Sequence, residues 1–260
     1  MTAEERTQIL NLLDAERQTV VYPGITRSSN AGVIKDVSAD GESAEIVYSA
    51  LSPDEADAAI RRELQTARNA GQELEWKLYG HDQPADLAER LVAAGFTADV
   101  RESFMVFPAD VASVRRFGNL NPSRHIRQIY DRDGLRDYQT ITEEVYGRSF
   151  ERQIEQFAFM LENHPASLSI YVAYVGDEPA ACGRVYFHSS SRFAGLFGGS
   201  TRERFRRRGL FTQIVAARLH EAVRRGVAYV CVDALPSSEP ILAKRGFEAV
   251  TYTQPFLSVG

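Results

Sequence analysis

An arginine-rich turn is the segment of this sequence with the clearest potential for chemistry. The sequence RERFRRRG lies between a strand-like stretch that ends at Thr201 and a helical stretch that begins at Leu210. The arginines at 206–208 repel one another unless an anion lies among them, and Gly209 allows close approach to the backbone. Free N–H groups at the start of a helix also favour an anion such as phosphate. The turn therefore predicts an anion site, with a solvated basic run on a surface helix as the alternative.

The elements that must position this turn alternate between strand and helix patterns. Apolar runs rich in β-branched residues predict strands at 125–129, 167–175, 180–188, 193–201, 227–234 and 247–257. Helical spacing predicts helices at 131–146, 150–163, 210–225 and 239–245. The sequence GDEP at 176–179 predicts a hairpin turn between two of these strands.

The N-terminal half repeats the last part of this pattern. It predicts a strand at 44–51, a helix at 53–70, a strand at 73–79 and a helix at 86–94. Gly71 and Gly95 follow these helices as Gly226 and Gly246 follow their counterparts, and LVAAGF resembles LAKRGF at the closing turn. We interpret this as an internal repeat; the alternative is that helix–Gly–strand junctions are common in any α/β protein.

Charge divides the chain into two unlike parts. Residues 1–110 contain 10 Lys+Arg and 20 Asp+Glu, a net charge of −10, whereas residues 111–260 contain 20 and 15, a net charge of +5. A basic second half favours an anionic ligand, while the overall charge of −5 opposes non-specific binding to nucleic acid or an anionic membrane. Residues 108–123 lack clean periodicity and contain Gly and Pro. We therefore predict a first domain at 1–110, a linker at 111–124 and a second domain at 125–260.

Composition excludes several classes of protein. With 44% hydrophobic and 25% charged residues, the chain resembles an average globular protein and can form a core. No segment approaches the roughly 20 apolar residues of a membrane span. The N-terminal sequence lacks the basic and apolar regions of a signal peptide, which predicts a cytoplasmic protein. Cys182 and Cys231 have no ligand-like spacing, so we expect buried thiols and neither a disulfide framework nor a metal site.

With these motifs, residues 125–257 resemble the GNAT superfamily of acyl-CoA-dependent N-acyltransferases. In that family a strand leads into an R/Q-x-x-G-x-G/A turn at the start of a helix, and Arg206, Gly209 and Phe211 stand at the motif positions. Phe211 departs from the usual small residue. The resemblance implies an α/β (α+β) protein with a tandem GNAT-like fold, in which helices flank mixed, mostly antiparallel central sheets.

The resemblance also implies where acetyl-CoA, the acyl donor, binds. The start of the helix would hold the CoA pyrophosphate, and the preceding strand would hydrogen-bond the pantetheine arm. Ser238, just before the last helix, corresponds to a polar residue that reaches this arm in relatives. The expected cofactor-binding residues are Gly199, Ser200, Thr201, Arg206, Arg207, Arg208, Gly209, Leu210, Phe211, Thr212 and Ser238.

The first half resembles a degenerate copy of the same fold. At the position of the phosphate turn it reads LSPDEAD, which contains neither glycine nor arginine. Asp54, Glu55 and Asp57 stabilise a helix start and would repel a pyrophosphate. We therefore expect one acetyl-CoA site, in the second half, with the first half as scaffold or as a wall of the acceptor pocket.

The resemblance implies that an amine attacks the thioester directly in a ternary complex, so Cys231 is expected in the core and not as a nucleophile. In many relatives a tyrosine of the closing helix protonates the leaving thiolate, but Leu242 stands here and Tyr252 is the candidate substitute acid. Asp233 ends an apolar strand near the expected acyl group and is the candidate base. Its alternative role is to cap the turn that follows.

These expectations favour an N-acetyltransferase that moves an acetyl group from acetyl-CoA to a primary amine of a small molecule. The acidic first half favours a cationic acceptor. The missing helix tyrosine favours the alternative, a non-catalytic acyl-CoA sensor or interaction module. A nucleic-acid-binding module built on the arginines is opposed by the short cluster and by the pI of about 5.6. We expect no nucleic-acid, membrane or metal partner.

Overall fold

The computed structural model describes residues 1–118 and 125–258, which group into two compact units. The first unit contains Met1–Met105, Asp233–Pro240 and the C-terminal strand from Glu248. The second unit contains Val106–Val232 and Ile241–Phe247. The last strand is thus part of the first unit, whereas the sequence-based limits assign it to the second domain. Domains predicted as continuous stretches of sequence miss a strand that pairs with a distant part of the chain.

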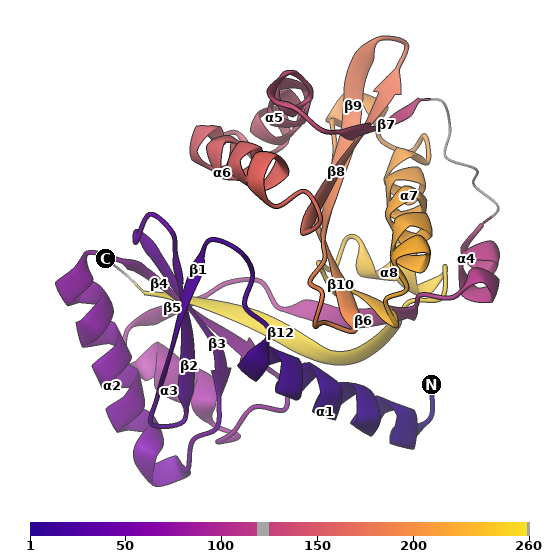
Figure 1. Ribbon diagram of the computed structural model, residues 1–260. Helices are drawn as coiled ribbons and strands as arrows, with labels where there is room; N and C mark the ends of the chain where they lie inside the picture. The colour runs from indigo at the N-terminus through magenta and orange to yellow at the C-terminus, as the bar shows by residue number, and fades with distance from the viewer. Residues whose placement is uncertain (119–124, 259–260) are drawn as a thin grey trace. The chain divides into compact units, whose positions relative to one another are not determined.

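The first unit is built on a sheet with the strand order β1–β2–β3–β4–β12. Its neighbouring strands are antiparallel except β3 and β4, and β5 pairs with β12. In Figure 1 the yellow strand β12 runs among the purple elements of this unit. The elements are α1 (Ala3–Thr19), β1 (Ile25–Asn30), β2 (Val33–Ser38), β3 (Ser43–Ser49), α2 (Pro53–Ala70), β4 (Glu73–Tyr79), α3 (Leu87–Ala93), β5 (Phe96–Ala98) and β12 (Glu248–Ser258).

Alternation along β4 gives this sheet one apolar and one polar face. Leu74, Trp76 and Leu78 are buried in a core with residues of α2 and α3. Glu75 and Lys77 point to the opposite face, because successive side chains of a strand alternate. The charged residues that break the apolar run are thereby placed together on one face.

The second unit contains a sheet with the order β11–β10–β9–β8–β7, in which only β10 and β11 are parallel. The predicted hairpin is confirmed, because β8 and β9 pair in antiparallel register through the turn at Gly176. The elements are α4 (Val111–Phe117), β7 (Ile126–Ile129), α5 (Arg132–Tyr146), α6 (Glu151–Asn163), β8 (Leu168–Val175), β9 (Glu178–Tyr186), β10 (Phe193–Thr201) and α7 (Leu210–Arg225). Three further elements, β6 (Glu102–Pro108), β11 (Tyr229–Ala234) and α8 (Glu239–Ala243), contain residues of both units.

Helices cover both faces of this second sheet. α5 and α6 lie on one face and α7 lies on the other (Figure 1). Cys182 of β9 is buried with Tyr138 of α5, whereas a side chain at the next residue, Gly183, would meet Ile214 and Arg218 of α7. β9 therefore separates two differently built cores.

The predicted linker is helical over Val111–Phe117, which corrects that part of the prediction. The Asp110 carboxylate accepts a hydrogen bond from the Ser113 amide and caps this helix. Val114 and Phe117 are buried, and the Phe117 ring packs against the ring of Phe107 with centroids 5.9 Å apart. The helix is therefore stabilised by two buried side chains and a cap. Its seven residues are too few to show a clear helical period in the sequence. Residues 119–124 of the linker lie outside the described residues.

The two halves share a local construction that agrees with the predicted repeat. β3–α2–β4 and β10–α7–β11 each join two parallel neighbouring strands through a helix. Gly71 and Gly226 end the two helices in left-handed conformation, with φ of 66° and 71°. Gly95 and Gly246 both have φ of 97° at the closing turns. The predicted class is confirmed: helices flank mixed, mostly antiparallel sheets. Within residues 1–118 and 125–258, every helix is too short or too polar to cross a membrane.

Candidate functional site

The arginine-rich turn links β10 to α7 in a backbone shape that few residues adopt. A 3₁₀ turn at Glu203–Phe205 follows the strand. Arg207 then has φ of 61°, and Gly209 has φ of 77° at the helix N-cap. A non-glycine residue with positive φ is uncommon and is concentrated at ligand clamps. Left-handed residues within a turn direct backbone N–H groups to one side, which is the geometry of an anion-binding nest.

The start of α7 carries no capping group from its own sequence. Gly209 offers no side-chain cap, and the first turn of the helix contains no acidic residue. The first helical hydrogen bond runs from the Gln213 amide to the Gly209 carbonyl. The positive end of the helix dipole is therefore left for an external anion.

The arginines of the turn divide into two groups. Arg202 is 7% exposed, and it donates to Glu144 at 2.7 Å and to Glu178 at 3.1 Å. Arg204 also pairs with Glu178. These ion pairs attach the turn to α5 and β9, and hydrogen bonding to Arg202 lowers the pKa of Glu144. In the sequence Arg202 is one member of a basic run, and its two partners lie 58 and 24 positions away.

The remaining arginines are free to meet a ligand. Arg206, Arg207 and Arg208 are exposed. In the part of the chain that the structure describes, none of them pairs with a carboxylate; Arg206 donates to the Thr201 carbonyl at 3.3 Å. The structure thus leaves three positive charges beside the uncapped start of α7, as the sequence predicts for an anion site.

The last part of β10 is irregular where the pantetheine arm is expected. The pairing with β9 shifts between Phe197 and Ser200, and Gly198 has φ of 57°. A Cβ at Gly199 would lie 3.0 Å from the Phe211 ring, so Gly199 makes room for the bulky residue of the motif. Ser200 is buried and donates to the Tyr146 hydroxyl at 3.4 Å. Thr201 Oγ1 is buried and has no partner among the described residues, a polar atom that a ligand could satisfy.

Leu210 and Thr212 complete the predicted segment. Leu210 is buried and anchors the first turn of α7, while Thr212 is half-buried. The structure therefore brings together every predicted cofactor residue from Gly199 to Thr212. Ser238 belongs to the first unit, where its hydroxyl donates to the Leu235 carbonyl at 3.1 Å and closes its own turn.

Asp233, the candidate base, is held in an ion pair. Its carboxylate accepts from Lys77 at 2.6 Å and from the Thr253 hydroxyl at 2.8 Å, within the first unit. Burial opposes the charge of Lys77, but Asp233 and other neighbours outweigh burial and hold the pKa of Lys77 well above its usual range. The turn after Asp233 is closed by the Leu235 carbonyl instead of the carboxylate. The side chain therefore stabilises the first unit.

Tyr252, the candidate acid, packs against the apolar core of the first unit. Its ring lies beside Gly80, where a Cβ would be 2.5 Å from Cδ1, and Arg101 stacks over it at 4.0 Å. Thr253, which contacts Asp233, points to the opposite face of β12. The structure does not bring Tyr252 and Asp233 together. Leu242, at the position of the family tyrosine, is 2% exposed and offers no acid.

Two carboxylates near Lys77 were missed by sequence analysis. Burial, followed by repulsion from Glu45, raises the pKa of Glu75 to about 7. Burial and the charge of Asp233 raise the pKa of Glu102 to about 7. Alternation along β4 could have placed Glu75 and Lys77 on one face, but the approach of Asp233 is non-local.

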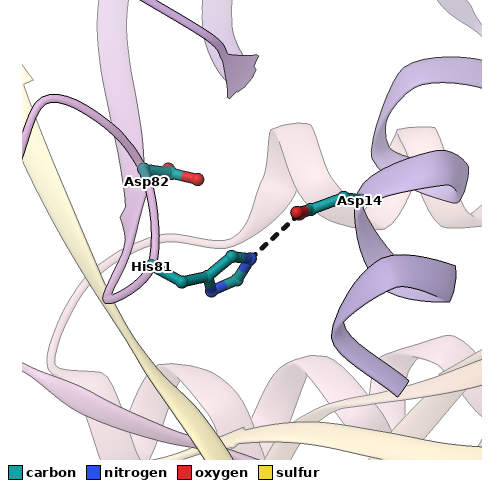
Figure 2. A group of neighbouring side chains, drawn as sticks. All are labelled: Asp14, His81 and Asp82. Carbon is teal, nitrogen blue, oxygen red and sulfur yellow. Dashed lines mark hydrogen bonds and ion pairs between the residues drawn. The ribbon is translucent and has the colours of Figure 1, made fainter. Parts of the chain in front are cut away.

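A second polar cluster, also missed, joins α1 to the loop after β4. Figure 2 shows Asp14 and His81 connected by a hydrogen bond of 3.0 Å, with Asp82 nearby. These are residues of metal-ligating types with their ligand atoms close together. However, Arg17 donates to Asp14 at 2.8 Å and to both oxygens of Asp82 at 2.8 and 2.9 Å. The guanidinium already pairs with both carboxylates of this cluster, which we interpret as a tie between α1 and the sheet.

The two cysteines have different surroundings. Cys182 is buried, and burial raises the pKa of its thiol to about 12, which suppresses the reactive thiolate. Cys231 is half-buried in β11, so the expectation of a fully buried thiol was wrong for this residue. Among the described residues, neither cysteine takes part in a disulfide.

The arginine-rich turn lies in a segment of the chain that matches a known protein family. Residues 127–247 match the model of the acetyltransferase (GNAT) family. They are a GNAT acetyltransferase domain, and the protein is an acyltransferase. No curated protein matches the sequence.

Solved structures with low sequence identity share the fold of nearly the whole chain. A GCN5-related N-acetyltransferase from Kribbella flavida is 15% identical, with a TM-score of 0.66 over 100% of this chain and 96% of that one. A functionally unknown protein from Staphylococcus epidermidis is 14% identical, with a TM-score of 0.66 over 92% and 95%. A tandem GNAT protein from the clavulanic acid biosynthesis pathway is 15% identical, with a TM-score of 0.59 over 98% and 94%. These likenesses concern the fold.

Proposed function

We propose that the protein is an N-acetyltransferase that moves an acetyl group from acetyl-CoA to a primary amine of a small molecule. The observation that carries this proposal is the start of α7, where an uncapped helix, two left-handed residues and three exposed arginines meet. The family match of residues 127–247 supports acetyl-CoA as the donor.

We further propose a tandem protein with a single acetyl-CoA site. The corresponding helix start in the first unit is closed by its own sequence: the Ser52 amide and hydroxyl both donate to the Glu55 carboxylate, at 3.2 and 2.6 Å. Hydrogen bonding to Ser52 lowers the pKa of Glu55 and keeps it charged. This carboxylate would repel a pyrophosphate, which supports a structural role for the first unit.

In this mechanism the chain binds and orients the donor. The backbone at the start of α7, with Arg206, Arg207 and Arg208, would hold the pyrophosphate, and the irregular end of β10 would align the pantetheine arm. Acetyl-CoA supplies an activated thioester. The amine nitrogen forms the new C–N bond as the C–S bond breaks, and the amine loses a proton while the thiolate gains one. Asp233 and Tyr252 have structural contacts, so the proposal does not depend on them as base and acid.

The direct test is CoA release from acetyl-CoA across a panel of primary amines, read with a thiol reagent. The proposal predicts turnover with at least one amine class and none with the Gly209→Glu variant. Saturable acetyl-CoA binding without CoA release from any amine would contradict the enzyme and favour the acyl-CoA sensor. An absence of acetyl-CoA binding would contradict both.

A further inference from the structure

A guanidinium without a counter-charge among the described residues lies beside the core of the second unit. Arg184 projects from β9 toward α5 and α6, where Cys182 and other core residues point. Its guanidinium carbon lies 5.0 Å from the ring centroid of Phe157, 5.8 Å from that of Tyr186 and 5.7 Å from that of Phe197. Aromatic faces stabilise a cation but do not neutralise it.

No carboxylate pairs with Arg184 within residues 1–118 and 125–258. Its Nη1 donates to the Tyr138 hydroxyl at 2.7 Å, and its Nε is buried without an acceptor. Burial disfavours the charge, but the phenol oxygens of Tyr138 and Tyr186 outweigh burial and raise the pKa of Arg184 above its usual range. The side chain thus remains a cation at every physiological pH. Buried charges are normally paired, because an unpaired one is costly.

Arg218 increases the positive charge on the other face of the same strand. It is 2% exposed, and its Nη1 donates to the backbone carbonyls of Arg184 at 3.0 Å and Phe197 at 3.4 Å. Burial lowers the pKa of Arg218 to about 10, so it too is charged near neutral pH. Two guanidinium groups therefore flank the sheet at this point.

Arg184 is located where β10 becomes irregular. Arg184 lies opposite Phe197 in the strand register. The residue after Phe197 is Gly198, which has φ of 57°. The Phe197 ring is 41% exposed and Arg184 itself is half-buried, so this cluster reaches the surface of the second unit. The same stretch of β10 continues to Ser200 and Thr201, which we assign to the acyl donor. An anion at Arg184 would thus lie beside the same strand whose end is proposed to align the pantetheine arm.

We propose that Arg184 binds a carboxylate of the acceptor, so that the substrate is an amine that also carries an acid group, such as an amino acid. This inference rests on the proposed N-acetyltransferase function. A single guanidinium with an unused Nε–H matches a monoanionic carboxylate, which arginine binds with two parallel hydrogen bonds. Tyr138 is a positioning residue that holds Nη1 and fixes the plane of the guanidinium.

The test uses matched acceptor pairs, each an amino acid and the amine that lacks its carboxylate, such as phenylalanine and 2-phenylethylamine or lysine and cadaverine. O-phosphoethanolamine with ethanolamine forms the phosphate arm. The wild type is expected to favour the carboxylated member of its best pair by about 100-fold in kcat/KM. An equal rate for both members, a preference for the plain amine, or a preference only for the phosphate compound would overturn the proposal.

Variants locate the preference at Arg184. Arg184→Met should abolish the roughly 100-fold preference while leaving the affinity for acetyl-CoA unchanged, and it should fold because the unbranched apolar side chain of methionine can pack against the same three aromatic rings. Tyr138→Phe should raise KM for the acid several-fold with little change for the plain amine. Arg136→Met is the matched control, since this α5 arginine is exposed and pairs with Asp133. If Arg184→Met keeps the preference of the wild type, the proposal is wrong.

Calorimetry with N-acetylated amino acids, the products, provides a readout that needs no turnover. The wild type should bind one of them and Arg184→Met should not. If the wild type acetylates plain amines but binds no N-acetylated amino acid, the carboxylate site at Arg184 is contradicted while the proposed acetyltransferase function is not. Failure of acetyl-CoA to bind would contradict the proposed function. Loss of product binding in Arg136→Met as well as in Arg184→Met would show that binding does not depend specifically on Arg184 and would also overturn the site.

Discussion

The helix starts of α2 and α7 occupy the same position in two similar strand–helix–strand segments, yet only the start of α2 is capped by its own side chains. At α2, Ser52, Pro53 and Glu55 satisfy the free backbone groups and the dipole within the chain. At α7, Gly209 supplies no cap and the neighbouring side chains are positive. A helix start that is left unsatisfied has a cost in stability, and an anionic ligand is the partner that removes this cost.

The same contrast extends to the two sheets. The first unit gathers Glu75, Glu102 and Asp233 around Lys77, so its half-buried polar face is acidic. The second unit contains the half-buried Arg184 and the buried Arg218, neither of which has a carboxylate partner among the described residues. The first arrangement is compensated in part within the chain, whereas the second supports the carboxylate site proposed at Arg184.

The largest expected effect comes from neutralising the open helix start. Replacing Arg206, Arg207 and Arg208 together with alanine should weaken acetyl-CoA binding about 100-fold and reduce its dependence on salt, because three charge-assisted contacts are lost. Calorimetric titrations at two salt concentrations measure both effects. Arg132→Ala is the matched control, since this exposed arginine at the start of α5 pairs with Glu155 and Glu162. An unchanged dissociation constant in the triple variant would remove the main difference between α7 and α2.

The acidic sheet face predicts an intermediate effect, on stability. The pKa of Glu75 is raised to about 7 in the folded protein, above its ordinary value of 4.5. The folded state therefore binds more protons than the unfolded state between about pH 4.5 and 7, and stability should fall as pH rises through this window. Glu75→Gln should flatten the decrease and raise the melting temperature at pH 8 by several degrees.

Thermal unfolding of the wild type and of Glu75→Gln from about pH 5 to pH 8 measures this pH dependence of stability. Glu73→Gln is the matched control, because Glu73 lies on the same strand and is exposed. A wild-type stability that does not change across the window, or an equal gain from Glu73→Gln, would show that the Glu75 carboxylate is not disfavoured in the folded state.

The smallest expected effect concerns the closed helix start. Ser52→Ala removes the hydroxyl that donates to Glu55 and should cost about 1 kcal/mol, which corresponds to a few degrees in melting temperature. Acetyl-CoA affinity should not change. Thr66→Ala is the matched control, because it removes an exposed hydroxyl later in α2 that donates to the Arg62 carbonyl. A weaker acetyl-CoA complex in Ser52→Ala would mean that the first helix start also takes part in donor binding.

The sequence predicted those features that depend on neighbouring residues. The bounds of α2, β4, β10 and α7 agree with the prediction, because each has a clear period and ends at a glycine or a turn. The donor turn was also readable, since its glycine and arginines are contiguous. The short α4 was missed because seven residues show too little periodicity. The unit of β12, the pairing of Asp233 with Lys77 and the anchoring of Arg202 depend on contacts between distant parts of the chain.

The proposed acetyl-CoA site at the start of α7 is tested most directly by calorimetric titration of acetyl-CoA into the wild type and into Gly209→Glu, with Gly209→Asn as the control. Asparagine tolerates the left-handed conformation of Gly209 and adds no charge, whereas glutamate places a negative charge at the helix start. We expect saturable binding to the wild type, weaker binding to Gly209→Asn and none to Gly209→Glu. Equal affinities for the wild type and Gly209→Glu would contradict the proposed site, because acetyl-CoA would then bind elsewhere.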